Sequence, residues 1–490
     1  MTAVARIIDW PADPADDCPL ALWSAVSIAR ATNGAANADF QVSGVEIDSR
    51  DVLPGDLFFA LKGEATDGHR FLESAFARGA AAAVVDRPVA FPHVLVSDTA
   101  AALEALAAAA RARSGARIVG VTGSVGKTGV KEAIFAALDR SGGGPGGYGA
   151  HRSVKSYNNH VGVPLSLARM PSRSSFGVFE IGMNHAGEIA ALTRQVRPHV
   201  AVVTTIAPAH IEMLGSEEAI ADAKAEIFEG LEPGGVAVIP ADSPHFARLK
   251  ARAERHAGTV VGFGRAAHAD VRLLDAISAA NGGSLVTVDM GDRRLCYTVA
   301  APGDHWVMNS LAVMAAVRAA GGDPGAAGVA LAEMEGMAGR GARIEITAAD
   351  GGRALVIDES YNANPASMRA TLAQLGRTAA RRRIAVLGAM KELGGHAPGF
   401  HAALAGPLAE AHVDFAILVG DEMQALADEL GKSGAGVLGK PFRFAHCRNP
   451  AEAQQVLADF GVGSGDAILV KGSNSVGLGV LVAALTAKEG

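Results

Sequence analysis

Residues 117–130 read RIVGVTGSVGKTGV, an apolar run that leads into a glycine-rich loop and then into a helical pattern. The usual nucleotide-binding loop is spelled G-x-x-x-x-G-K-[ST], with its first glycine six positions before the lysine. Here that position holds Val121, and the glycines stand at 120, 123 and 126. Because the order strand, loop and helix is retained, the stretch predicts a parallel α/β sheet with an anion-binding loop at the end of one strand.

The residue types in this loop suit the phosphates of a nucleotide. Gly123 and Gly126 permit a positive φ and a close approach of the backbone to an anion. The amino end of the following helix then directs N–H groups toward that anion. Lys127 can reach the β- and γ-phosphates, and the Thr128 hydroxyl can ligate Mg²⁺. The alternative is a glycine-rich turn with a surface lysine, which the strand-loop-helix context and the G-K-T order disfavour.

The composition is that of a folded protein with several domains. A chain of 490 residues suggests two to four domains, and 49% hydrophobic against 19% charged residues predicts a large apolar core. The net charge of −7 and the lack of a long Lys/Arg block argue against nucleic acid as the main ligand.

The cellular setting follows from what the chain does not contain. The N-terminal residues have no signal-peptide core, and no apolar stretch reaches the roughly 18 residues of a membrane span. Cys18, Cys296 and Cys447 have no metal-type or C-x-x-C spacing, which fits a reducing compartment without structural disulfides. We therefore expect a cytoplasmic protein.

Short apolar runs alternate with helical patterns through most of the chain, which predicts an α/β fold with three domains. We expect a small N-terminal α/β domain over 1–114, with strands at 56–61 and 81–85 and a helix at 69–78. A central parallel-sheet domain with the phosphate loop should cover 115–337, and a C-terminal doubly wound, Rossmann-like domain 338–490. The further strands expected in these two domains are 117–122, 176–183, 199–206, 354–358, 383–388, 415–420 and 467–472, with a helix at about 306–320.

The loop G-x-x-G-K-T without the earlier glycine resembles that of the Mur ligase family, and the resemblance covers nearly the whole chain. These are ATP-dependent amide-bond ligases of peptidoglycan precursor synthesis, and folylpolyglutamate synthases are relatives with a similar loop. The resemblance implies that the loop binds ATP. It assigns to the nucleotide the residues Gly123, Ser124, Val125, Gly126, Lys127, Thr128 and Gly129.

Two further segments resemble the segments that carry the metal and catalytic residues of the family. In EIGMNHAGEI (180–189), the resemblance makes Glu180 a Mg²⁺ ligand beside Thr128. In APAHIEMLGSEEAIADAKAEIF (207–228), it places His210 at a second metal and makes Lys224 a lysine that takes up CO₂ to become a carbamate. Without the resemblance, each has an ordinary structural reading: an edge carboxylate, a structural histidine and a solvated helix lysine.

The nucleotide's other contacts are also implied by resemblance. GDHWVMNS (303–310) places Asn309 at the adenine, GRGARIEI (339–346) brings Arg340 to the phosphates, and VIDESYNANPASM (356–368) places Asp358 on the ribose side.

The N-terminal segment VSGVEIDSRDVLPGDLFFALKGEATDGHRF (42–71) resembles the domain that binds a UDP-sugar. Ser49, Arg50 and Lys62 are its candidate contacts, and Gly63 and the D-G-H of 67–69 extend the site. The alternative is a polar surface loop.

KSYNNHVGVPLSLARM (155–170) and SYNANPASM (360–368) resemble the branch of the family that adds D-alanyl-D-alanine to a UDP-N-acetylmuramoyl-tripeptide. The candidates for contacting the substrates are therefore Asn158, Asn159, Asn184, His185 and Asn362, although asparagines also serve as loop staples. Three positions depart from the branch: Gly129 stands where Ser or Thr is frequent, Ala389 replaces aspartate, and Asn474 replaces arginine.

The resemblance implies a monomeric enzyme that uses ATP and Mg²⁺, with no nucleic acid and no membrane span. ATP would activate a carboxylate as an acyl phosphate, and an amine would then attack it. Two alternatives stay open. The enzyme could add a different amine, as its sister ligases do, or the chain could be an ATPase switch whose product is a conformational change.

Overall fold

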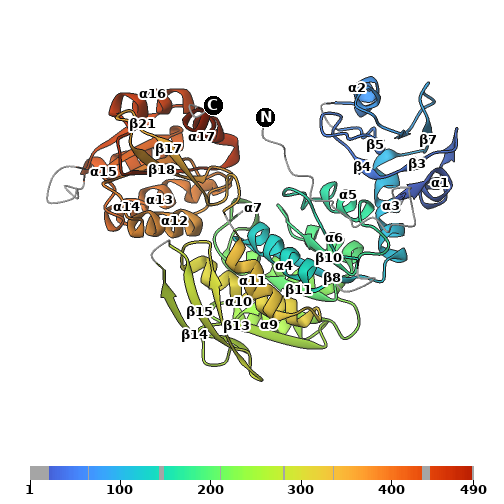
Figure 1. Ribbon diagram of the computed structural model, residues 1–490, viewed down its shortest axis with the longest axis horizontal. Coiled ribbons are helices and arrows are strands. Elements are labelled where there is room, and N and C mark those ends of the chain that lie inside the picture. The colour runs from blue at the N-terminus through green and yellow to red at the C-terminus, as the bar shows by residue number, and fades with distance from the viewer. Residues whose placement is uncertain are drawn as a thin grey trace. The chain divides into compact units, whose positions relative to one another are not determined.

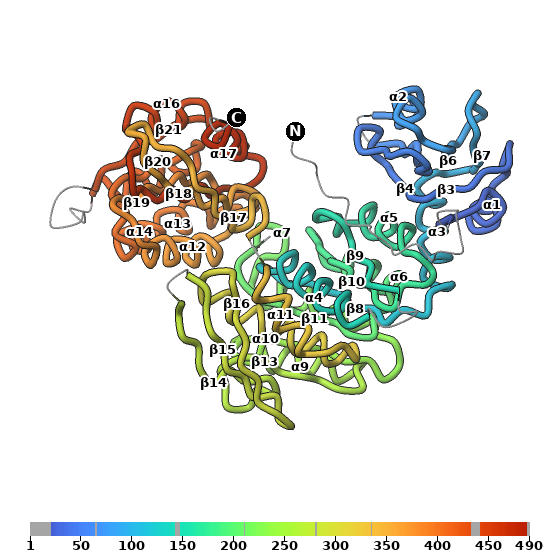
Figure 2. The backbone as a smooth tube through the Cα atoms, viewed as in Figure 1, coloured from blue at the N-terminus to red at the C-terminus, as the bar shows by residue number. Residues whose placement is uncertain are grey.

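The computed structural model describes residues 21–63, 66–142, 148–209, 211–279, 282–334, 336–432 and 442–487 (Figures 1 and 2). The chain forms two compact units. The first comprises residues 1–116 and 151–175, and the second comprises 117–150 and 176–490. Cys296 and Cys447 are free thiols, whereas Cys18 lies outside the described residues. In the part of the chain that is described, no helix combines the length and apolarity that a bilayer crossing requires.

The first unit is built on a five-stranded sheet in the order β2-β7-β6-β5-β4. Only β2 runs antiparallel to its neighbour. The strands are β2 (Ala35–Ala36), β4 (Gly44–Glu46), β5 (Asp56–Phe59), β6 (Ala82–Val85) and β7 (His93–Leu95). A short pair, β1 (Trp23–Ser24) and β3 (Gln41–Val42), forms a second sheet. The predicted strands at 56–61 and 81–85 are confirmed, and the predicted helix begins as a 3₁₀ turn (Gly68–Phe71) before α2 (Leu72–Ala77).

Residues 151–175, which the predicted boundaries placed in the central domain, belong to this first unit. Their helix α5 (Gly162–Ala168) packs against α3 (Thr99–Arg113). The carbonyl oxygen of Ala168 accepts a hydrogen bond from Trp23 Nε1 at 2.8 Å. The N-N-H-V-G-V-P stretch is therefore part of the same unit as the segment 42–71, although about 100 residues separate them in the chain. The division into three domains stays a prediction.

The second unit contains a nine-stranded sheet in the order β16-β15-β14-β13-β12-β11-β8-β10-β9. Its parallel part includes β8 (Arg117–Thr122), β10 (Phe176–Glu180), β11 (Val200–Val203), β12 (Val236–Pro240) and β13 (Thr259–Gly264). The edge strand β9 (Ala150–Arg152), which spans the boundary between the two units at residues 150 and 151, lies beside β10. The predicted parallel sheet is confirmed, but its antiparallel extension was not expected. That extension consists of β14 (Val271–Ser278), β15 (Ser284–Asp289) and β16 (Arg294–Val299), where β15 pairs antiparallel with both neighbours.

Helices cover both faces of this sheet. On one face, α4 (Lys127–Ser141), α10 (Asp304–Ala319) and α11 (Pro324–Glu333) pack on one another, as Figure 1 shows. They share one apolar core with the alternate residues Val119 and Val121 of β8. On the other face, Gly120 lies near Ile227, which belongs to a 3₁₀ turn (Glu226–Gly230). Helices α6 (Glu188–Val196) and α8 (Glu217–Ala225) adjoin that turn.

A six-stranded sheet in the order β17-β18-β22-β19-β20-β21 completes the second unit. All neighbours are parallel except β17 and β18. Its strands are β17 (Ala342–Thr347), β18 (Arg353–Glu359), β19 (Arg382–Gly388), β20 (Phe415–Val419), β21 (Phe444–Cys447) and β22 (Asp466–Lys471). Alternate residues of β19 enter two apolar cores on opposite faces, one with α12 (Pro365–Arg377) and α15 (Gln424–Lys432), the other with α16 (Pro450–Phe460) and α17 (Gly479–Thr486). The predicted doubly wound sheet is confirmed.

Candidate active site

The glycine-rich loop lies between β8, a central strand, and the amino end of α4. Gly123 has φ 148° and Gly126 has φ 86°, values that side-chain-bearing residues rarely adopt. The neighbouring side chains also leave no room for a Cβ at either position. A Cβ at position 123 would lie 2.0 Å from Thr204 Oγ1, and one at position 126 would lie 2.9 Å from Asn309 Oδ1. Both glycines are therefore required, and the loop presents the amino end of α4 to an anion.

The loop is held in place from the neighbouring strand. Thr204, which follows β11, donates its hydroxyl to the carbonyl oxygen of Val125 at 2.6 Å. The Ser124 hydroxyl donates to the Ala207 carbonyl at 2.9 Å and accepts from the Ala207 N–H at 3.0 Å. Ser124 thus supports the loop through its side chain. Thr204 was missed by the sequence analysis, although a polar residue directly after a buried strand was the available signal.

The two predicted Mg²⁺ ligands lie together. Glu180 ends β10, which pairs with β8, and its Oε2 accepts a hydrogen bond from Thr128 Oγ1 at 2.8 Å. Only 1% of Glu180 and 5% of Thr128 is exposed. A hydroxyl and a carboxylate are oxygen donors of the kind that Mg²⁺ prefers beside nucleotide phosphates, so the residues present fit that ion.

Lys127 folds back over its own loop. Its Nζ donates to the Gly123 carbonyl oxygen at 2.7 Å. Burial lowers the pKa of Lys127, while the negative charge of Glu180 acts in the opposite direction. Nζ therefore lies against the backbone of the loop, where a bound phosphate could replace the carbonyl as its partner.

Lys224 is buried near the end of α8, with 1% of the residue exposed. Desolvation, followed by the positive charge of Lys127, lowers its pKa well below the usual value. Within the described ranges, no hydrogen bond or ion pair of its ammonium group is found. Because the residue is buried, Lys224 is not an ordinary solvent-exposed lysine of a helix. His210 lies outside the described residues.

Glu226, two residues after Lys224, accepts hydrogen bonds from the backbone N–H groups of Gly187 at 2.7 Å and Ala190 at 3.1 Å. These are the orphan donors at the amino end of α6. The carboxylate of Glu226 therefore joins the lysine segment to the loop that follows Glu180. In that loop Asn184 and His185 are exposed, and His185 Nδ1 lies 3.0 Å from Glu188 Oε1.

The remaining nucleotide candidates lie in a helix, in a turn and at the end of a strand. Asn309 is buried in α10 against Gly126. Arg340 stacks on the ring of Tyr361, with its guanidinium carbon 4.3 Å from the ring centroid. Asp358 ends β18 in a buried position, and its carboxylate accepts bonds from the Gly339 N–H and from Ser360.

Lys471 was not among the candidates. It is 1% exposed, and its Nζ donates to the Asn362 carbonyl at 2.8 Å with Glu359 Oε2 at 3.4 Å. Burial lowers its pKa. The signal that could have found it is a lysine that ends an apolar strand beside a glycine, in VKGS.

The candidates in the first unit divide into exposed and structural groups. Ser49 is buried, whereas Arg50 is exposed and pairs with Asp48 through Nη2 and Oδ2 at 2.6 Å. Lys62 pairs with Asp86 at 2.5 Å. Asn159 accepts from the N–H of Gly162 at 2.9 Å and so caps α5, as a loop staple does. Asn158 is half-buried before it.

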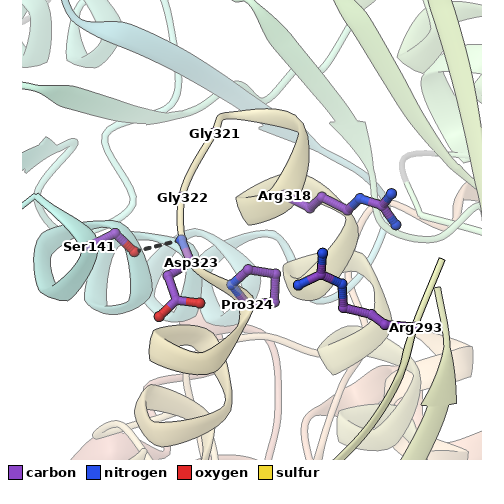
Figure 3. A pocket seen from close by; sticks show the side chains of 7 residues that line it. All are labelled: Ser141, Arg293, Arg318, Gly321, Gly322, Asp323 and Pro324. Atoms are coloured by element: carbon purple, nitrogen blue, oxygen red, sulfur yellow. Dashed lines mark hydrogen bonds between the residues drawn. The ribbon is translucent and has the colours of Figure 1, made fainter.

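A surface pocket of about 440 Å³ lies at the other end of α4 (Figure 3). Figure 3 shows Ser141 hydrogen-bonded to the backbone N–H of Asp323, with Arg293 and Arg318 nearby. Because α4 has 15 residues at a rise of about 1.5 Å each, this pocket is about 20 Å from the phosphate loop. It is not the nucleotide site.

Sequence profiles of three domains match the chain in order. Residues 41–118 match the Mur ligase family catalytic domain, 121–317 the Mur ligase middle domain and 342–474 the Mur ligase glutamate ligase domain. The chain belongs to the Mur ligase family. Curated relatives in the family include the UDP-N-acetylmuramoyl-tripeptide--D-alanyl-D-alanine ligases of Synechocystis sp. and Bacillus subtilis. They are 33% and 34% identical, over 92% and 90% of this chain and 93% and 92% of theirs.

Solved Mur ligases have the same fold. MurF from Acinetobacter baumannii matches 94% of this chain and 98% of its own, with a TM-score of 0.79 and 29% identity. MurF from Thermotoga maritima, solved in complex with ADP, matches 91% and 98%, with a TM-score of 0.72 and 26% identity. Because the chain belongs to this family, it is an ATP-dependent ligase. The individual roles of the site residues stay predictions.

One departure from the pattern of Mur ligases has a physical reason here. A Cβ at Gly129 would lie 2.8 Å from Cη2 of Trp306, which is buried against α4. The indole fills the space that a Ser or Thr side chain would need. Ala389 is fully buried and Asn474 is exposed, and nothing in the structure explains these two replacements.

Proposed function

We propose that this chain joins D-alanyl-D-alanine to UDP-N-acetylmuramoyl-tripeptide with ATP, giving the UDP-linked pentapeptide, ADP and phosphate. The observation that carries the proposal is similarity over about nine-tenths of the chain to curated ligases of that activity. The buried pair of Thr128 and Glu180 beside the phosphate loop supports the use of ATP with Mg²⁺, because a hydroxyl and a carboxylate can hold the ion that phosphoryl transfer needs. We place the enzyme in the cytoplasm, where it acts as a monomer.

In the first step, an oxygen of the tripeptide's terminal carboxylate attacks the γ-phosphorus of ATP. The bond from that phosphorus to the bridging oxygen breaks, and ADP leaves with the electron pair. Lys127 would exchange its bond to the Gly123 carbonyl for the transferring phosphoryl group, and the amino end of α4 would stabilise the same charge. Thr128 and Glu180 would hold Mg²⁺, which when bound offsets negative charge on the phosphates.

In the second step, the amine of D-alanyl-D-alanine attacks the carbonyl carbon of the acyl phosphate. The carbon–oxygen bond to phosphate then breaks, phosphate leaves, and the nitrogen loses a proton. We assign Arg340 to the phosphates, Asn309 to the adenine and Asp358 to the ribose side. Asn158, Asn159, Asn184, His185 and Asn362 are proposed for the substrates, with Ser49, Arg50 and Lys62 for the UDP-sugar. Asn159 would contact a substrate only through its Nδ2 amino group, because its Oδ1 accepts the N–H of Gly162 at the start of α5.

We further propose that Lys224 is a carbamate in the active enzyme. Desolvation, followed by the positive charge of Lys127, lowers its pKa and so favours the neutral amine, which is the form that adds to CO₂ with loss of one proton. The product is an anion, which the positive charge of Lys127 would stabilise. With His210, it would support a second Mg²⁺.

The experiment that tests the acceptor is a product analysis by mass spectrometry. The purified chain is incubated with ATP, Mg²⁺ and UDP-N-acetylmuramoyl-tripeptide, together with D-alanyl-D-alanine, D-alanine or an L-amino acid in separate reactions. We expect a pentapeptide product with the dipeptide alone. A product formed only with a single amino acid would keep the ligase and replace the acceptor.

A further inference from the structure

The side chain of Arg340 lies on a planar support. Its guanidinium carbon is 4.3 Å from the centroid of the Tyr361 ring, well within the distance of a cation–π contact. Tyr361 is itself 39% exposed, so much of the ring is not used to fill a core. A large exposed aromatic ring beneath an arginine is a feature that packing alone does not require.

The backbone that carries each partner is fixed separately. The carboxylate of Asp358 accepts from the Gly339 N–H at 2.7 Å and from the Ser360 hydroxyl at 2.6 Å, so it binds both loops. The Tyr361 N–H donates to the Gly339 carbonyl at 3.1 Å. On the other side, Lys471 Nζ holds the Asn362 carbonyl at 2.8 Å. The ring therefore has a defined position with respect to the turn from which Arg340 extends.

The charge of Arg340 acts at the phosphate loop. It lies close enough to Lys127 for the two side chains to interact electrostatically. An arginine near an anion-binding loop adds positive charge that favours a polyanion there. An arginine has a long flexible side chain, so its guanidinium loses rotamer freedom when it binds a phosphate. A ring that holds the guanidinium beforehand reduces that loss.

We propose that Tyr361 is a positioning residue for the nucleotide's phosphates, acting through Arg340. The inference rests on the proposed function and adds a residue whose role lies in the ring face rather than in the hydroxyl group. Tyr361 holds the guanidinium over its ring, and Arg340 then meets ATP with its orientation already set. We therefore expect a substitution of Tyr361 to lower kcat/KM for ATP only when Arg340 is present.

The test is a double-mutant cycle on ATP and on D-alanyl-D-alanine kinetics. Tyr361→Leu is expected to lower kcat/KM for ATP by about 2- to 30-fold, the range of a cation–π contact, while Tyr361→Phe restores it because the ring face is kept. In an Arg340→Ala background, Tyr361→Leu is expected to have no further effect. Tyr361→Met serves as a second variant if the leucine does not fold, as judged by circular dichroism.

Three results would overturn the proposal. In the first, Tyr361→Leu lowers kcat/KM for ATP as much in the Arg340→Ala background as in the wild type. In the second, Tyr361→Phe lowers kcat/KM for ATP as much as Tyr361→Leu does. In the third, Tyr361→Leu raises KM for D-alanyl-D-alanine and leaves the kinetics with ATP unchanged, which would make Tyr361 a substrate contact. The affinity of each variant for ATP with Mg²⁺, measured by calorimetry, separates this failure from failure of the proposed function. The same double-mutant cycle, calculated from ATP affinities, tests the contact between Tyr361 and Arg340 even if no ligase activity is found.

Discussion

Replacing Thr128 by valine removes one oxygen at the centre of the site while keeping the shape of the side chain. Thr128 Oγ1 donates to Glu180 Oε2 at 2.8 Å, and both residues are almost completely buried. A hydrogen bond to a charged group contributes about 1.5–3 kcal/mol, which corresponds to about 10- to 150-fold in rate. We therefore expect Thr128→Val to lower kcat/KM for ATP by that factor and to raise the Mg²⁺ concentration at half-maximal rate.

The assay is phosphate release under saturating substrates, measured over a series of Mg²⁺ concentrations. Thr128→Ser is the matched control, because it keeps the hydroxyl and loses only a methyl group, and we expect it to stay within about threefold of the wild type. Thermal melting of both variants establishes that they are folded at the assay temperature. Wild-type activity and Mg²⁺ dependence in Thr128→Val, or equal impairment in Thr128→Ser, would refute the assignment of this pair to the metal.

Lys224→Ala should be nearly inactive in the ligase assay and partly rescued by small carboxylates. Wild-type activity in this variant would contradict the proposed carbamate at Lys224. Gly129→Thr should lower the free energy of unfolding by about 1–3 kcal/mol through its clash with Trp306, as urea unfolding would measure, and Trp306→Leu should relieve the loss. Burial lowers the pKa of His151 to about 4, although the Ser166 carbonyl bound to its Nε2 opposes the shift. The unfolded chain, with a histidine pKa near 6.5, then binds more protons, so stability on the order of 3 kcal/mol is present above pH 6.5 and lost as the pH falls toward 4. A His151→Gln variant with the same pH dependence of unfolding would contradict this assignment.

The parts of the fold that follow local rules could be predicted from the sequence. Strand 117–122 and the helix after it follow from an apolar run, a glycine-rich loop and helical spacing. The structure has the strand at these residues, and the helix, expected to end at Leu138, continues to Ser141. The neighbouring position of Glu180 was also predictable, because the ends of adjacent parallel strands meet at one edge of a sheet.

What could not be predicted depends on contacts between segments far apart in the chain. Nothing local in 151–175 indicates that it packs with the first unit, since that placement arises from the contact of α5 with α3. The reason for Gly129 lies in Trp306, which is 177 residues away by their numbering. The cap that Glu226 gives to α6 and the support that Thr204 gives to the loop are of the same kind. Such partners are fixed by tertiary packing, which periodicity does not encode.

The measurement that tests the account most directly is phosphate release from ATP with Mg²⁺, with UDP-N-acetylmuramoyl-tripeptide and D-alanyl-D-alanine added separately and together. We predict full turnover only with both substrates, no more than a trace with either one, and none in Lys127→Ala, whose fold is checked by circular dichroism. Turnover at the same rate with neither substrate would contradict the ligase and favour an ATPase whose product is a conformational change.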